Sequence, residues 1–191
     1  MAKSNITPTI HSERVKTVRL GATGSGNQYA DSEAGKAVKQ SGESAYVLCA
    51  AGDPIEGIVQ SVNVGLFDGY SVGGIASTGY LAVTFDGLEA TPGTGAVALG
   101  DYVVCGTVVA AGTALTGALK VCKATNQPGV AVVSTVGAAD TAAAVKTVLD
   151  AALVKVADAQ ANLAYAWKVV SLGSAGTGAV GTTGVVERVS A

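Results

Sequence analysis

Few side chains in this chain have the types and spacing that chemistry requires. His11 is the only histidine, so a histidine-based metal site would need carboxylates or thiols from elsewhere, and a general base would need an orienting partner. We expect His11 to be an exposed residue of a polar N-terminal segment. Cys49, Cys105 and Cys122 each lie inside a short apolar run, which favours buried, unreactive thiols. The sequence predicts no catalytic residue and no metal site.

The acidic residues of the first half of the chain mostly lie beside glycine or proline, where an aspartate side chain stabilises a turn. They are Asp53, Glu56, Asp68, Asp86, Glu89 and Asp101. Two of them could converge as the acid and base of a glycosidase, which leaves an unrecognised hydrolase as an alternative. The segment GATGSG (21–26) lacks the Lys-Ser/Thr ending of a phosphate-binding loop, so we expect a turn there and no cofactor.

The composition indicates one domain with a substantial core and an unusual surface. The 191 residues are 49% hydrophobic but only 5% aromatic and 14% charged, and 26 of them are glycine. A surface with so little charge suits a chain covered by neighbours in an assembly, although a monomer built of small residues remains open. The net charge of −2 gives no field that would attract nucleic acid or an anionic membrane.

Short apolar runs separated by turn residues predict a mainly β protein, a small barrel or sandwich of antiparallel strands. No apolar run reaches membrane-spanning length, and residues 1–10 lack the apolar region of a signal peptide, so we expect synthesis in a reducing cytoplasm. Asp86-Gly87 has the composition of a two-residue hairpin turn. The expected strands are Val15–Leu20, Gly35–Val38, Ala45–Cys49, Gly57–Val62, Tyr80–Phe85, Tyr102–Cys105, Thr107–Ala110, Trp167–Leu172 and Val185–Val189, the last two forming a terminal hairpin.

One stretch without glycine or proline predicts a helix over about 141–160, although the β-branched LVKV segment (153–156) leaves a strand open for its C-terminal half. Its apolar residues recur at intervals of three and four, and Asp140 is a candidate N-cap. These positions are Val145, Val148, Leu149, Ala152 and Val156. We therefore expect residues 1–26 to form an N-terminal arm and first strand, and residues 27–191 a single β-rich domain containing this helical insertion.

Two groups of residues are candidate contacts to a capsid or to another subunit. Arg14, Lys16 and Arg19 form a basic group on and before the first expected strand; they could make a solvated strand face or meet an acidic patch on a partner. Phe67 and Tyr70 lie in the glycine-rich segment VGLFDGYSVGG, where aromatic residues could fill the core or anchor an interface.

The layout of strands and turns resembles bacteriophage capsid decoration (cement) proteins. The resemblance rests on GKAVKQSG, AAGDPIEGIVQSV, GDYVVCGTVVAAGT and QPGVAVVS, followed by a closing hairpin. It covers about residues 31–134 and the terminal strands; the LFDGYSVGG loop and the helical run depart from the family pattern.

This resemblance implies a non-enzymatic virion protein without cofactors, made in the host bacterial cytoplasm. It would bind major capsid protein subunits at their junctions on the outer capsid surface, often as a dimer or trimer, and stabilise the expanded DNA-filled shell. Another phage structural or adhesion module, such as a head fibre base or a tail component, is the alternative.

Overall fold

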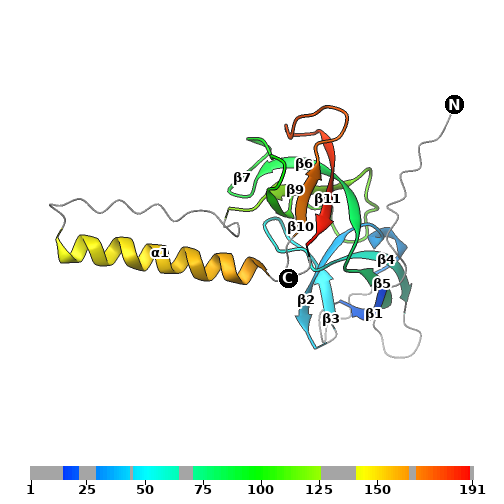
Figure 1. Ribbon diagram of the computed structural model, residues 1–191. Coiled ribbons are helices and arrows are strands. Elements are labelled where there is room, and N and C mark those ends of the chain that lie inside the picture. The colour runs from blue at the N-terminus through cyan, green and yellow to red at the C-terminus, as the bar shows by residue number, and fades with distance from the viewer. Residues whose placement is uncertain are drawn as a thin grey trace.

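The computed structural model describes residues 15–21, 29–43, 45–64, 71–125, 141–163 and 167–189. Within these ranges the chain forms two groups of β-strands and one long helix (Figure 1). The expectation of a mainly β fold with one helical insertion is confirmed. Residues 1–14, where we expected an arm, lie outside the described residues.

The first group of strands closes on itself as a five-stranded barrel in the order β1-β3-β2-β4-β5. Its strands are β1 (Val15–Leu20), β2 (Ala37–Gly42), β3 (Ala45–Leu48), β4 (Gly57–Val64) and β5 (Ser71–Ala76). A short 3-10 helix, η2 (Asp31–Glu33), precedes β2. β2 and β3 pair as an antiparallel hairpin. β1 is antiparallel to β5 along its whole length and parallel to β3 at its end.

The second group is a six-stranded sheet in the order β11-β10-β8-β9-β6-β7, and β11 also pairs with β6. Its strands are β6 (Tyr80–Leu88), β7 (Thr91–Pro92), β8 (Tyr102–Cys105), β9 (Leu119–Lys123), β10 (Trp167–Ser171) and β11 (Thr183–Arg188). The terminal hairpin of β10 and β11 is confirmed as an antiparallel pair.

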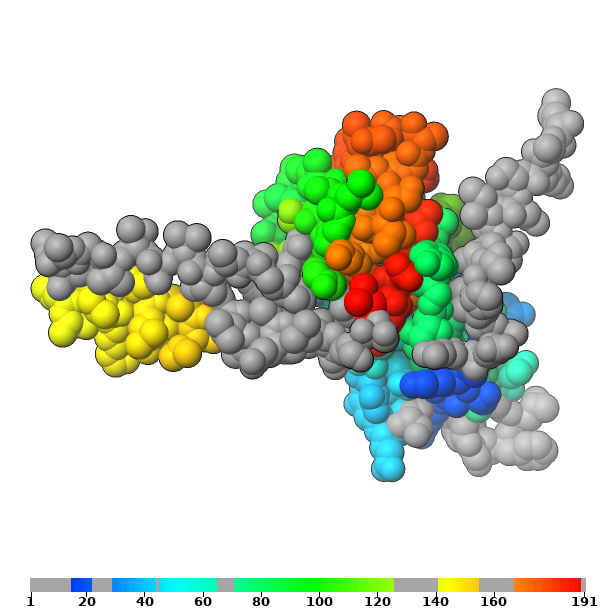
Figure 2. Space-filling view, in the orientation of Figure 1, coloured from blue at the N-terminus to red at the C-terminus, as the bar shows by residue number. Residues whose placement is uncertain are grey.

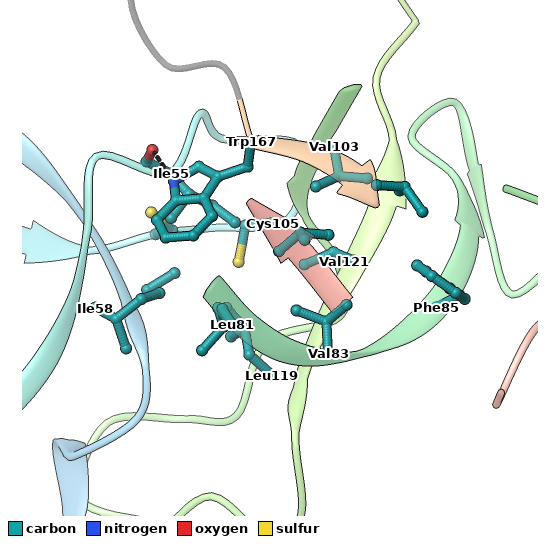
Figure 3. Packing of buried hydrophobic residues seen from close by; sticks show 14 of the residues in the cluster. Ile55, Ile58, Leu81, Val83, Phe85, Val103, Cys105, Leu119, Val121 and Trp167 are labelled. Atoms are coloured by element: carbon teal, nitrogen blue, oxygen red, sulfur yellow. Dashed lines mark hydrogen bonds between the residues drawn. The ribbon is translucent and has the colours of Figure 1, made fainter. Parts of the chain in front are cut away.

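A shared hydrophobic core joins the barrel to the sheet. Trp167 and Phe85 from the sheet belong to the same buried cluster as Ile55 and Ile58, which come from the barrel side (Figure 3). The indole Nε1–H of Trp167 donates a hydrogen bond of 3.1 Å to the Ile55 carbonyl. Because burying an indole without a partner for its N–H is costly, this bond fixes the sheet against the segment between β3 and β4.

The long helix, α1 (Ala142–Leu163), confirms the predicted helical insertion. Its first turn is capped by Thr141, whose hydroxyl accepts the Ala144 N–H at 3.3 Å; Asp140, the expected cap, lies outside the described residues. Figure 1 shows α1 projecting away from the strands. Among the residues described, no helix is both long enough and apolar enough to span a membrane.

The Asp86-Gly87 turn prediction is wrong, because β6 continues through both residues to Leu88. The pairing of β6 with β9 shifts register between Phe85 and Leu88, so the pair forms a bulge. Gly87 has φ +86°, and a Cβ there would lie 2.1 Å from the Thr94 carbonyl oxygen, so only glycine fits. The tight turn follows Leu88 instead, before β7.

Two further predictions about strands need correction. Residues 107–110 form no strand and belong to the loop between β8 and β9. The strand β5 was not predicted, since its Gly73-Gly74 pair resembles a loop. A Cβ at Gly73 would lie 2.3 Å from the Ser61 carbonyl oxygen and 2.5 Å from Leu20 Cδ1, so β5 needs glycine in order to approach both neighbouring strands.

Candidate binding surface

The first half of β1 offers backbone that no described strand pairs on one side. β5 pairs with all six residues of β1, from Val15 to Leu20. On the opposite side, β3 pairs only with Arg19 and Leu20. Residues 15–17 are exposed, and β1 lies at the surface of the barrel (Figure 2). A stretch that the described strands leave unpaired on one side can accept a strand from another chain. We call residues 15–18 the open edge.

The alternation of the strand shows which backbone groups of the open edge face outward. The Gly21 N–H donates to the Tyr46 carbonyl of β3 at 2.8 Å, so the odd-numbered N–H groups of β1 point toward the β3 side. Successive residues of a strand alternate in this direction. Thr17 therefore presents its N–H at the open edge, whereas those of Lys16 and Val18 face β5. This geometry makes Thr17 the position at which strand addition can be tested.

The predicted basic group is only partly brought together. Lys16 is exposed at the start of β1, and Arg19 is half-buried near its end. Because the two residues are three positions apart in a strand, their side chains point to opposite faces. Lys16 is exposed beside the open edge, while Arg19 points to the opposite face of β1, the face of Thr17. Arg14, Phe67 and Tyr70 lie outside the described residues, so their proposed contacts stay predictions.

A buried ion pair at the junction of barrel and sheet was not predicted from the sequence. Glu33 and Lys36 are 1% and 4% exposed, and the ammonium of Lys36 contacts the carboxylate of Glu33. Lys36 Nζ also donates to the Ala110 carbonyl at 2.9 Å. Glu33 Oε1 accepts the Gly112 N–H at 2.6 Å. The pair therefore holds the β8–β9 loop against the barrel.

A small pocket next to this ion pair has a volume of about 20 Å³, and its lining includes Lys36, Cys49 and Cys105. Such a volume holds about one water molecule. A hydrogen bond with Cys105, together with burial, raises the pKa of Cys49 far above its usual range. Burial, followed by the charge of Asp86, raises the pKa of Cys122 to about 11. These two thiols are protonated at neutral pH and are poor nucleophiles.

All three cysteines are free and buried, which confirms the expectation of buried thiols. A signal for their environment was present in the sequence, since each lies inside an apolar run. The described chain contains no group of three or more His, Cys, Asp or Glu side chains that could hold a metal ion.

The described carboxylates act largely as acceptors for backbone N–H groups. Asp53 Oδ2 accepts from Ala50 at 2.6 Å, and Asp101 Oδ2 accepts from Ala98 at 2.7 Å. Both hydrogen bonds span three residues, the geometry of a side chain stabilising its own turn. The expectation that these aspartates serve turns is confirmed at both positions.

Two other carboxylates join segments that are distant in the sequence. Asp86 Oδ2 accepts the Thr107 N–H at 2.8 Å, and Glu89 Oε2 accepts the Thr125 N–H at 2.6 Å. Both therefore act in holding loops to the sheet. Asp68 lies outside the described residues.

Comparison with known proteins gives no relative: no family model, no curated protein and no solved structure matches this chain.

Proposed function

We propose that this protein is a non-enzymatic phage head decoration protein. It binds at junctions between major capsid protein subunits on the outer surface of the virion and stabilises the expanded, DNA-filled capsid. The proposal is supported by the resemblance in strand and turn signatures and, above all, by the open edge of β1. A protein that joins subunits needs surfaces that extend a neighbour's sheet, and it needs no reactive group.

The energetics of such binding favour small contacts repeated many times. A strand added over four residues forms only a few hydrogen bonds, each contributing about 0.5–1.5 kcal/mol net. On a shell, symmetry repeats each contact at every equivalent junction, so modest contacts add up over the whole particle. The exposed Lys16 beside the open edge suits an acidic patch on the capsid partner.

The direct test mixes the purified full-length chain with expanded capsids that lack decoration. We expect stoichiometric binding in sedimentation assays and a higher capsid melting temperature. Absence of binding at a large molar excess would reject the proposed function.

A pair of variants at one position tests the role of the open edge. Thr17→Pro removes the outward N–H, whereas Thr17→Ala keeps it and removes only the side-chain hydroxyl. We expect Thr17→Pro to bind capsids at least tenfold more weakly and Thr17→Ala to bind as the native chain does. Fluorescence of Trp167, the only tryptophan, verifies that both variants are folded. Equal binding by the two variants would exclude strand addition at this edge.

A further inference from the structure

Two of the buried cysteines, Cys49 and Cys105, form a pair across the junction of the barrel and the sheet. Cys49 follows the last residue of β3, and Cys105 is the last residue of β8. They are 5% and 2% exposed and belong to the same hydrophobic cluster (Figure 3). Their thiols share a hydrogen bond. Cys122 belongs to a different cluster, so the three cysteines divide into one contacting pair and one separate thiol.

Backbone contacts also bring the two cysteines together. The chain turns shortly after Cys49 and then passes Cys105. The Cys105 N–H donates to the Asp53 carbonyl at 2.9 Å, and the Cys105 carbonyl accepts the Gly52 N–H at 2.8 Å. The Cys49 thiol donates to the next carbonyl, that of Pro54, at 3.5 Å. Segments joined by backbone hydrogen bonds lie about 4.8 Å apart, within the range of about 4.4–6.8 Å that a disulfide bridges between Cα atoms.

A small pocket connects this pair with the surface. It has a volume of about 20 Å³, and its lining includes Cys49, Cys105, Thr107 and Val108. Because Thr107 and Val108 are exposed, the pocket reaches the surface at the start of the β8–β9 loop. Such a volume admits a molecule about the size of water. Hydrogen peroxide is scarcely larger than water, whereas Ellman's reagent and glutathione disulfide are many times larger, so the pocket selects a small oxidant.

We propose that Cys49 and Cys105 form a disulfide when the folded chain meets hydrogen peroxide. The sulfur of one cysteine attacks a peroxide oxygen, which breaks the O–O bond and gives a sulfenic acid and one water molecule. The sulfur of the other cysteine then attacks the sulfenic sulfur, which forms the S–S bond and releases a second water molecule. The two thiols together lose two electrons and two protons, and one peroxide is reduced to two water molecules.

The reaction is slow, because thiols attack as thiolates. The hydrogen bond with Cys105, together with burial, raises the pKa of Cys49, which keeps its thiolate scarce at neutral pH. We therefore expect the disulfide to form over hours.

The cross-link would fasten the barrel to the sheet. It closes the loop of residues 49–105, and this restriction of the unfolded chain stabilises the folded one. In a reducing cytoplasm the pair would remain as two thiols, and the disulfide would form where peroxide prevails over reductants. The inference concerns the folded chain alone and does not rest on the proposed function.

The test exposes the purified, fully reduced, full-length chain to millimolar hydrogen peroxide under native conditions for several hours. Catalase then removes the peroxide, and the chain is unfolded, alkylated with iodoacetamide and analysed by mass spectrometry. We expect a chain lighter by two hydrogen atoms, with Cys122 as its one alkylated thiol. Calorimetry should show a melting temperature higher by roughly 4–16 °C, and dithiothreitol should reverse this rise.

Two kinds of variant separate the pair from other thiol chemistry. Cys122→Ala removes a buried thiol outside the pocket and should cross-link as the native chain does. Cys105→Ala should show no rise in melting temperature after peroxide treatment. Cys49→Ala gives the same test from the other side of the pair if Cys105→Ala folds poorly. Circular dichroism verifies that each variant is folded.

Three results would overturn the inference. Three alkylated thiols after peroxide treatment would show that the oxidant does not reach the pair. A sulfinic acid on Cys49 or Cys105 without a cross-link would show that the two sulfurs cannot close on each other. A disulfide that includes Cys122, or one that joins two chains, would show that the pocket does not direct the reaction.

Discussion

Replacing Lys36 by methionine removes the cation from a carboxylate that has almost no contact with water. Glu33 is 1% exposed and would keep the Gly112 N–H as its main donor, at 2.6 Å. The Ala110 carbonyl would lose the ammonium that now donates to it. Removing one charged side chain of a buried ion pair lowers the free energy of unfolding by about 3–5 kcal/mol. For a chain of this length each kcal/mol lowers the melting temperature by roughly 2–4 °C, so we expect Lys36→Met to melt roughly 6–20 °C lower.

The double variant Glu33→Met/Lys36→Met separates the charge penalty from the loss of packing. With both charges gone no uncompensated ion is buried, so the double variant should be more stable than Lys36→Met alone. Lys146→Met is the control for removing a lysine. Its ion pair with Asp150 is largely exposed, and its loss should cost about 0.5 kcal/mol or less.

The assay is urea unfolding followed by the fluorescence of Trp167, which is 1% exposed in the folded chain. The reasoning about Glu33 would be refuted if Lys36→Met lost less than about 1 kcal/mol. It would also be refuted if the double variant were no more stable than the single one, because the cost would then come from packing and not from an isolated charge.

Trp167→Phe leaves the Ile55 carbonyl without its donor and should cost about 1–3 kcal/mol from that loss alone, measured by calorimetry. Gly73→Ala should cost about 1–3 kcal/mol or more, because the new Cβ would meet the Ser61 carbonyl oxygen, and a melting temperature equal to that of the native chain would contradict this close approach. The three thiols should react with Ellman's reagent only at the rate of unfolding, and rapid labelling of the native chain would contradict their burial. Because the pKa of Cys122 is raised to about 11 in the folded chain, the unfolded chain loses the thiol proton at a lower pH than the folded chain does. The free energy of unfolding should therefore fall between about pH 9 and 11, and Cys122→Ala should reduce that fall.

Local patterns in the sequence were sufficient for the elements whose stability is local. Alternation identified β1, and the long run without glycine or proline identified α1. These patterns predict the elements because the periodicity of a strand or a helix can be recognised within one continuous stretch of residues. β5 and the Asp86-Gly87 bulge failed for a different reason. At both places glycine is required by a close approach to a distant segment, whereas within the local sequence a glycine indicates a turn.

The same distinction explains what the sequence revealed about functional surfaces. Lys16 could be named as an exposed strand cation, but its separation from Arg19 onto the other face follows only once both are placed in β1. The open edge depends on where β3 begins to pair with β1, which no pattern within β1 encodes.

The Glu33–Lys36 pair shows how a surface pattern can occur in the interior. In the sequence, an acidic and a basic residue three positions apart in DSEAGK are typical of a solvated turn. The barrel instead places them under the β8–β9 loop, where the backbone at Ala110 and Gly112 supplies the hydrogen bonds that water would otherwise make. A buried pair of this kind contributes little net stability relative to apolar residues, but either charge alone is strongly unfavourable there. The pair therefore favours the one arrangement in which the loop lies across both residues. If the amide hydrogens of the β8–β9 loop exchanged as slowly in Glu33→Met/Lys36→Met as in the native chain, apolar packing alone would be sufficient to hold the loop there.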